Sequence, residues 1–389
     1  MNVRSILVAI GILAGAVCGA FPSAAQPSAK AVAPSCSGPN PNVAMPNAPH
    51  GMYVWAPGER MTALLQKYVI GKDPTLCGAS IVVRWADLEK SQGVYDFSPA
   101  EALAKPFTDA GLTVNFLFAE ATEGKDEVTP AWVMSQVPTT SCGAERPLPV
   151  YWNPKFEAMW SAFIKRAIDH FSNTSPIRNQ IGYLRFAIGG GAEAIAPPGA
   201  YGNDPCAKPL KALGFSYDVW KAHTLKILDV MGSAPTTHQI VAALPAIPGG
   251  KSQFELTNTF AAAAAAKHVG LSFESLGVQG IAAPGARPGP CDPKSDLHWC
   301  AAFKKYAGVV PLAMQPITAS WKTNHAKIDF TNLLQVALDN RIQIFELYPD
   351  EWLQAHGVKE WDKLQPGKMP KHKAALEAAS KVLGQAAVK

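Results

Sequence analysis

Three glutamates that lie at or just beyond the ends of apolar runs are the residues of this sequence best suited to acid–base chemistry. Glu193 follows three consecutive glycines, Gly189 to Gly191, whereas Glu274 follows the run Val269 to Phe273 and Glu346 lies within Ile344 to Leu347. Glycine allows tight turns and a close approach of the backbone to a ligand, so we expect Glu193 at the mouth of a site. Two carboxyl groups that flank a glycosidic bond can hydrolyse it. The alternatives without chemistry are that Glu193 is an ordinary surface residue of a loop and that Glu274 only forms hydrogen bonds at the rim.

Aromatic residues are found near the ends of the same apolar runs. Flat rings at a cleft stack on sugar faces, although tryptophan and tyrosine also pack in ordinary cores, and packing is the better interpretation for any single ring. Gln315 is the polar residue at the end of another run. The candidate substrate-binding residues are therefore Trp55, Trp85, Glu274, Gln315, Tyr348 and Trp352.

Other chemistries have weaker support in the sequence. There is no GxSxG motif for acyl hydrolysis, no GxGxxG or phosphate-binding loop after an apolar run, and no paired Cys/His spacing typical of zinc. The net charge of +5 is spread along the chain, which does not indicate a nucleic-acid partner. We therefore expect no metal and no cofactor, and the sequence leaves the oligomeric state open.

Apolar, strand-like runs alternate with segments of helical period from Gly51 onwards. The predicted strands are Met52 to Trp55, Ser80 to Trp85, Leu112 to Phe118, Ile181 to Ile188, Gln239 to Leu244, Val269 to Phe273, Val309 to Met314 and Ile342 to Leu347. Helical segments lie between them; in Phe156 to Phe171, for example, the apolar residues share one stripe. Alternation of this kind indicates a parallel sheet covered by helices, and eight repeats favour closure into a single-domain (β/α)8 TIM barrel.

The N-terminus has the pattern of a secretory signal peptide. Arg4 precedes an apolar run and small residues end at Ala25, so we predict a signal peptide at 1–25, an extended Pro- and Ser-rich leader at 26–48 and the barrel domain at 49–389. Six cysteines remain after cleavage, which in an exported protein predicts three disulfides. The predicted location is secreted or periplasmic, with no membrane span in the mature chain.

One stretch resembles a known family. The residues Arg84 to Glu89, followed by Gly93 to Phe97 and by the pair Gly111-Leu112, resemble the W..LE...G.YDF segment of clan A glycoside hydrolases, which are (β/α)8 enzymes. The likeness is clear in the second and third β/α units and weaker elsewhere. Within this motif, Trp85 is interpreted as structural first, as a residue that caps the rim of the barrel.

The resemblance implies roles for two of the glutamates. It maps the acid/base residue, at the end of the fourth strand, onto Glu193, although Ala192 stands where the family usually has Asn. The family nucleophile ends the seventh strand, but here that strand ends in Gln315-Pro316, and Glu346 is the best remaining partner. Either the strand count is off by one, or Glu346 belongs to the eighth strand. In the second case the separation between Glu193 and Glu346 suits an inverting mechanism of hydrolysis, or sugar binding without cleavage. We thus expect a glycosidase that acts on carbohydrate, or alternatively a non-catalytic carbohydrate-binding barrel.

Overall fold

The computed structural model describes residue 36 and residues 49–200, 205–245, 250–276, 298–316, 330–363, 367 and 369–385. The predicted signal peptide and all of the predicted leader except Cys36 lie outside these residues. Those two predictions therefore stay predictions.

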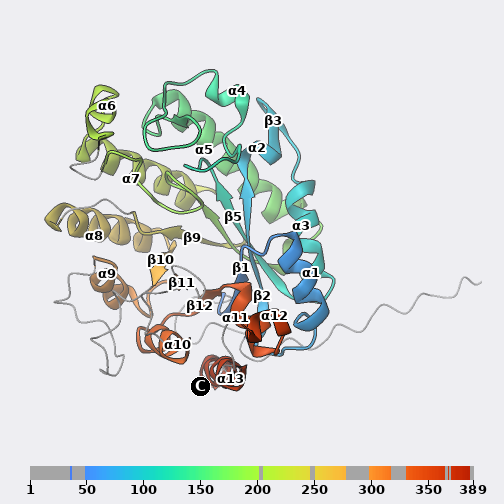
Figure 1. The fold of residues 1–389 in the computed structure, drawn as a ribbon. Helices are drawn as coiled ribbons and strands as arrows, with labels where there is room; N and C mark the ends of the chain where they lie inside the picture. The colour runs from blue at the N-terminus through green and yellow to red at the C-terminus, as the bar shows by residue number, and fades with distance from the viewer. Residues whose placement is uncertain are drawn as a thin grey trace, which may run out of the picture.

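Eight parallel strands close into a barrel in the order β1-β12-β11-β10-β9-β8-β5-β2 (Figure 1). They are β1 (Gly51–Trp55), β2 (Leu76–Arg84), β5 (Thr113–Ala119), β8 (Ile181–Phe186), β9 (Gln239–Ala243), β10 (Gly270–Leu276), β11 (Leu312–Pro316) and β12 (Ile344–Leu347). Each predicted run overlaps one of these strands, and the count was right, because β11 is the seventh strand and β12 the eighth. The (β/α)8 fold class is confirmed.

Helices surround the barrel, and two small hairpins extend the loops at its mouth. The α-helices are α1 (Glu59–Tyr68), α2 (Trp85–Leu88), α3 (Ser98–Thr108), α4 (Ala131–Met134), α5 (Pro154–Asp169), α6 (Ala207–Ala212), α7 (Tyr217–Ser233), α8 (Gly250–Ala266), α9 (His298–Tyr306), α10 (Phe330–Asp339), α11 (Pro349–Ala355), α12 (Lys359–Asp362) and α13 (Met369–Gln385). A π-helix, η2 (His170–Thr174), and a 3-10 helix, η3 (Arg178–Gln180), lie between α5 and β8. The hairpins pair β3 (Glu89–Ser91) with β4 (Val94–Tyr95) and β6 (Thr139–Thr140) with β7 (Leu148–Pro149). No helix among the described residues has both the length and the apolarity needed to cross a membrane.

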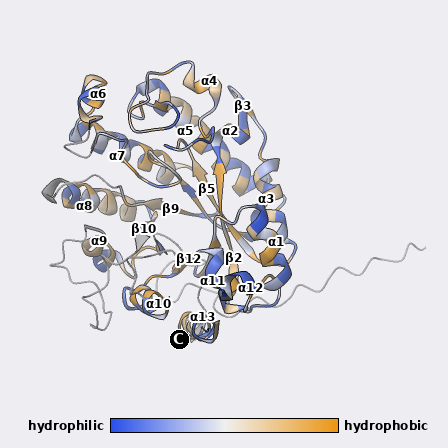
Figure 2. Ribbon diagram, in the orientation of Figure 1, coloured by the Kyte–Doolittle hydropathy of each residue, from blue (hydrophilic) through white to orange (hydrophobic). Residues whose placement is uncertain are grey.

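Two hydrophobic clusters form the core, and the barrel wall separates them. The larger cluster lies between the strands and the helices, and the smaller one fills the barrel interior with residues such as Tyr53, Leu117, Tyr183 and Val241. Figure 2 shows mixed hydrophobic and hydrophilic colouring on the surrounding helices, as expected for elements that bury one face and expose the other.

Helix α5 shows how the local sequence specifies its own element. Asn153 caps the helix by accepting hydrogen bonds from the backbone of Lys155 and Phe156, and Pro154 occupies the first turn, where its missing N–H costs nothing. The predicted apolar stripe is buried, which confirms it: Met159, Trp160, Phe163, Ile164, Ala167 and Ile168.

Trp85 belongs to the core between α2 and α5. Its ring has no exposed surface and contacts Trp132, Trp160 and Phe163 with centroid separations of 6.1, 5.0 and 5.6 Å. Its indole N–H donates to the Glu89 carboxylate at 2.7 Å, and that carboxylate also accepts the backbone N–H of Gly93 at 2.8 Å. The motif that carries the resemblance is therefore structural at Trp85 and Glu89. The candidate role of Trp85 in contacting substrate is corrected, because no part of the ring is open to a ligand.

Two disulfides agree with the predicted framework, at opposite ends of the barrel. Cys142–Cys206 joins the loop after β5 to the loop after β8, whereas Cys36–Cys77 fixes residue 36 against the start of β2. Cys300 is also disulfide-bonded, and Cys291 lies outside the described residues. The first bridge lies at the carboxyl-terminal end of the strands, whereas the second lies at their amino-terminal end.

Candidate functional site

The turn that carries Glu193 is held by backbone hydrogen bonds on both sides. Ile188 N–H donates to the Glu193 carbonyl at 2.7 Å, and Gly191 N–H donates to the carbonyl of Ala121, just beyond β5, at 2.9 Å. Gly189 adopts a φ of 107°, and a Cβ there would lie 2.2 Å from the backbone oxygen of Ile195. The first of the three glycines is thus required by backbone conformation and by space.

Glu193 is a half-buried carboxyl with an unusually high proton affinity. Burial is the main cause that raises its pKa, from 4.5 to about 8, and the negative charges of Glu274 and Glu346 add to the effect. The positive charge of Arg185 acts in the opposite direction but does not cancel it. Near neutral pH this group is therefore mostly protonated, the state that a general acid needs.

Arg185 joins the two other candidate glutamates inside the barrel. One guanidinium nitrogen, Nη1, donates to Glu274 at 3.0 Å and to Glu346 at 3.0 Å. The Arg185 and Glu346 side chains are 1% and 0% exposed, whereas that of Glu274 is 5% exposed. Ser272 also donates its hydroxyl to Glu274. The structure thus brings Glu193, Glu274 and Glu346 into one electrostatic cluster at the carboxyl ends of β8, β10 and β12.

Hydrogen bonds continue from this cluster toward the floor of the barrel. The Tyr183 hydroxyl donates to Glu346 and also lies 3.3 Å from the Ser80 hydroxyl, which accepts from Asn115 at 3.1 Å. Burial raises the pKa of Tyr183 far above its usual range, and the charge of Glu346 raises it further, so the phenol stays a donor. Glu346 is held from below by this chain of neutral groups.

Three of the candidate substrate-binding residues form a second group at the mouth. The rings of Trp55 and Tyr348 meet edge to face with centroids 5.1 Å apart, and Gln315 hydrogen-bonds the Tyr348 hydroxyl. Burial raises the pKa of Tyr348, and the negative charge of Glu193 raises it further, which places this ring near the acid. The Trp55 indole nitrogen and the Gln315 side-chain oxygen are buried and have no hydrogen-bond partner among the described residues. Such groups are suited to bind polar atoms of a ligand.

Trp352 lies away from this group. It is in α11, has no exposed surface and belongs to the cluster between strands and helices. Its candidate role in contacting substrate is corrected for the same reason as that of Trp85: burial leaves no face for a sugar.

Two residues of the site were missed by sequence reasoning. Arg185 is a charged residue inside the apolar run Tyr183 to Ile188, and a buried charge in a strand is the signal that pointed to it. Glu120 directly follows β5, is completely buried and accepts a hydrogen bond from the backbone N–H of Gly189. Burial raises the pKa of Glu120 well above its ordinary value, so the carboxyl is neutral. Its position immediately after a predicted strand was the available signal.

Comparison with solved structures gives matches that span most of this chain at low sequence identity. The catalytic domain of a β-amylase from Paenibacillus polymyxa superposes with a TM-score of 0.54 at 12% identity, covering 83% of this chain and 98% of that one. Xylanase 10B from Thermotoga maritima has a TM-score of 0.46 at 11% identity, with coverages of 86% and 97%. An exo-β-1,4-mannosidase from Opitutaceae bacterium strain TAV5 has a TM-score of 0.49 at 13% identity, with coverages of 90% and 62%.

Comparisons of sequence add no relative. No family model matches the chain, and no curated protein is significantly similar to it. At 12% identity the β-amylase likeness is a likeness of fold. The chain therefore has the (β/α)8-barrel fold of the glycoside hydrolases that its sequence resembles.

Proposed function

We propose that this protein is a glycoside hydrolase in which Glu193 is the general acid. The supporting observation is the position of Glu193, which is half-buried on a turn held by backbone hydrogen bonds and lies beside two further carboxyl groups, where burial raises its pKa. Hydrolysis needs one carboxyl that gives a proton to the leaving oxygen and a second that stabilises or forms the bond at the anomeric carbon. The high pKa of Glu193 suits the first task.

Glu274 and Glu346 compete for the second task. The sequence favoured Glu346, on the strand opposite β8 in the closed barrel. Three observations favour Glu274: its side chain keeps 5% exposure against 0% for Glu346, its charge acts on Glu193 more strongly than that of Glu346, and among the described residues a phenol donates to Glu346 but none to Glu274. We therefore assign the carboxylate that faces substrate to Glu274. Glu346 then acts through Arg185, which it holds in place, and the pair of Glu193 with Glu346 is the alternative.

Binding residues complete the proposed reaction. Trp55 and Tyr348 offer an aromatic surface for a sugar ring, and the amide of Gln315 can contact a hydroxyl. As the glycosidic bond breaks, Glu193 transfers its proton to the departing oxygen and becomes a carboxylate. That carboxylate then accepts a proton from the attacking water, which restores the acid. The predicted export of the protein fits its disulfides and stays part of the proposal.

A non-catalytic carbohydrate-binding barrel is the second candidate. It is favoured by one observation: Glu274 and Glu346 both bind the same nitrogen of Arg185, and neither is more than 5% exposed on its side chain. A carboxylate that is fully engaged in this way would support the architecture of the mouth without reaching an anomeric carbon.

Turnover by the glutamine variants of Glu193, Glu274 and Glu346 tests the proposal. We expect Glu193→Gln and Glu274→Gln each to lower kcat at least about a hundredfold on aryl glycosides and polysaccharides, the scale of losing a positioned acid or base. In the wild type, kcat/KM should fall as pH rises through about 8, because Glu193 loses its proton there. Release of reducing ends measures both effects.

A matched control and two contrary outcomes complete this test. Glu101→Gln alters a carboxyl that is 18% exposed and lies on α3, outside the mouth, and it should leave kcat unchanged. If Glu346→Gln abolishes turnover while Glu274→Gln does not, the choice of partner is wrong. If the wild type binds saccharides but turns none over, the non-catalytic barrel is the correct function.

A further inference from the structure

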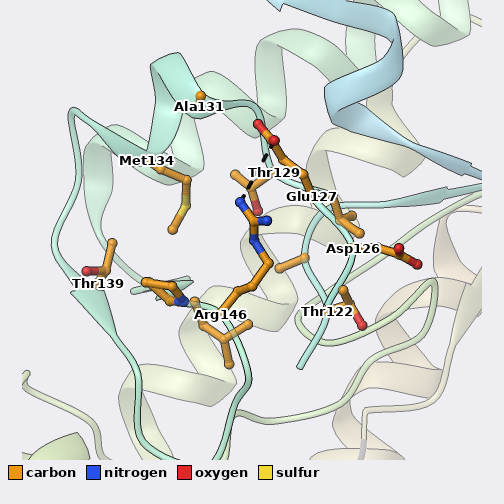
Figure 3. Close-up of a pocket in the computed structure, with 12 residues that line it drawn as sticks. Thr122, Asp126, Glu127, Thr129, Ala131, Met134, Thr139 and Arg146 are labelled. Atoms are coloured by element: carbon orange, nitrogen blue, oxygen red, sulfur yellow. Dashed lines mark ion pairs between the residues drawn. The ribbon is translucent and has the colours of Figure 1, made fainter. Parts of the chain in front are cut away.

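A cavity lies in the loop that follows β5. It has a volume of about 300 Å³, at the lower end of the range for small-molecule sites. Figure 3 shows the guanidinium of Arg146 directed toward Glu127, with Met134 and Thr139 on the side away from Asp126. The lining residues are Ala121, Thr122, Asp126, Glu127, Val128, Thr129, Ala131, Met134, Thr139, Arg146, Pro147 and Leu148.

Two lining residues connect this cavity to the turn of Glu193. Ala121 forms β-bridges with Gly190 and Gly191, the glycines that precede the acid. Val128 packs in the cluster of the barrel interior together with Ala192, the direct neighbour of Glu193. The cavity therefore lies next to the turn that carries the proposed acid.

The walls of the cavity are fixed by covalent and hydrogen bonds. The disulfide Cys142–Cys206 ties the outer wall to the loop after β8. The backbone of Glu145 donates to Glu123 at 2.9 Å, and the short strands β6 and β7 pair at the base of the same loop. A site that is formed before binding loses less entropy when a ligand enters.

The chemistry of the lining suits a neutral, polyhydroxylated ligand. Arg146 supplies hydrogen-bond donors, Asp126 and Glu127 supply acceptors, and threonine hydroxyls can do both. Met134 and its aliphatic neighbours offer an apolar wall for C–H groups. An anion is disfavoured, because the lining carries two carboxylates and one guanidinium.

From these observations we infer that the cavity binds a sugar unit of an extended saccharide whose neighbouring units occupy the barrel mouth. This inference rests on the proposed function, since it takes the mouth as a carbohydrate site. It makes the substrate class an oligosaccharide or polysaccharide chain rather than a small glycoside. Arg146 and Glu127, paired at 3.8 Å and each about half exposed, are the residues that discriminate by chain length.

Calorimetric titration of the full chain carrying Glu193→Gln tests the inference without turnover. The probes are di- and tetrasaccharides built of glucose, of xylose or of mannose. We expect at least one tetrasaccharide to bind about tenfold more tightly than its disaccharide, and Arg146→Ala to remove most of that gain while leaving disaccharide affinity unchanged. The methyl resonance of Met134, labelled with carbon-13, should shift with the tetrasaccharide only.

The chain offers a closely matched control. Arg166 is 48% exposed and pairs with Asp169 on α5, whereas Arg146 is 49% exposed and pairs with Glu127, so Arg166→Ala should leave both affinities unchanged. The inference is overturned if Arg146→Ala lowers the affinity for disaccharide and tetrasaccharide equally. It is also overturned if the variant keeps the full gain in affinity with chain length, or if no probe binds. A third result is that the wild type hydrolyses no saccharide while tetrasaccharide binding still depends on Arg146. That result refutes the proposed function but supports the cavity as a sugar-binding site.

Discussion

At the scale of single residues, Arg185 determines the electrostatics of the barrel mouth. Burial by itself lowers the pKa of a guanidinium, but the charges of Glu346 and Glu274 outweigh it and raise the pKa, so Arg185 stays charged. Its Nε and Nη2 atoms are buried and have no hydrogen-bond partner among the described residues. Leaving buried donors unpaired costs about 1–3 kcal/mol for each group, a cost that a binding site recovers when a ligand accepts these bonds.

The Trp85 side chain gives a prediction about stability at the same scale. Because its ring is completely buried among Trp132, Trp160 and Phe163, Trp85→Ala should lower the free energy of unfolding by about 3–5 kcal/mol. Urea denaturation followed by circular dichroism measures this change. A variant with unchanged stability that no longer binds saccharides would contradict the structural role.

At the scale of elements, the loops after β5 and β8 act as one unit. Gly191 donates to the Ala121 carbonyl, Gly189 donates to the Glu120 carboxyl, and Cys142–Cys206 closes the unit on its outer side. These bonds join segments that lie about 70 residues apart, as in the separation of 69 between Gly189 and Glu120. The rigidity of the Glu193 turn thus depends on a neighbouring element.

Substitution of Glu120 tests this dependence between elements. Since the buried carboxyl is neutral and acts as an acceptor, Glu120→Gln preserves the bond to Gly189 and should keep kcat within about threefold of wild type. Glu120→Ala leaves that N–H unpaired, which should destabilise the fold by about 1–3 kcal/mol and lower kcat more than Glu120→Gln does.

Amide hydrogen exchange at Gly189 separates the two effects. Exchange of the Gly189 amide should stay slow in Glu120→Gln and become fast in Glu120→Ala. This measurement needs no substrate. If the glutamine variant exchanges and turns over like the alanine variant, Glu120 does not position the turn through this hydrogen bond.

At the scale of the whole molecule, the barrel concentrates carboxyl groups with a raised pKa at one end. Glu193, Glu274 and Glu120 all have a raised pKa, with burial as the main cause. A group whose pKa is higher in the folded state binds its proton more tightly there, so it stabilises the fold at low pH. That contribution is lost as the pH rises through the folded pKa.

The stability of the protein should therefore fall between pH 6.5 and 8.5. The contribution of Glu193 is complete below its unfolded pKa of 4.5 and disappears as the pH passes about 8. His223 and His238, whose pKa values are lowered by burial, lose their destabilising effect by about pH 6.5 and do not mask this slope. The unfolding free energy from urea titrations at several pH values should decline, and Glu193→Gln should make the decline shallower. An identical slope in wild type and variant would show that Glu193 titrates normally.

The local sequence was enough to predict the strands and to select Glu193 as a candidate. A parallel strand buried on both faces is a continuous apolar run whatever lies around it, so all eight strands, and the stripe of α5, could be found. Glu193 was found because its glycines are adjacent in sequence. The boundaries were less accurate: β2 begins at Leu76 rather than Ser80, since the small residues Gly78 and Ala79 do not signal a strand.

Only the tertiary structure decided which side chains share the mouth. Arg185 binds Glu346 across 161 residues and Glu274 across 89, and no pattern of spacing encodes such contacts. Burial also separates Trp85 and Trp352 from Trp55, although all three are tryptophans near strand ends. Hydrophobic periodicity is a property of residues that are close in sequence, so it determines the helices and strands. Desolvation and charge depend instead on which groups are close in space. Closure of the barrel therefore determines which carboxyl holds a proton.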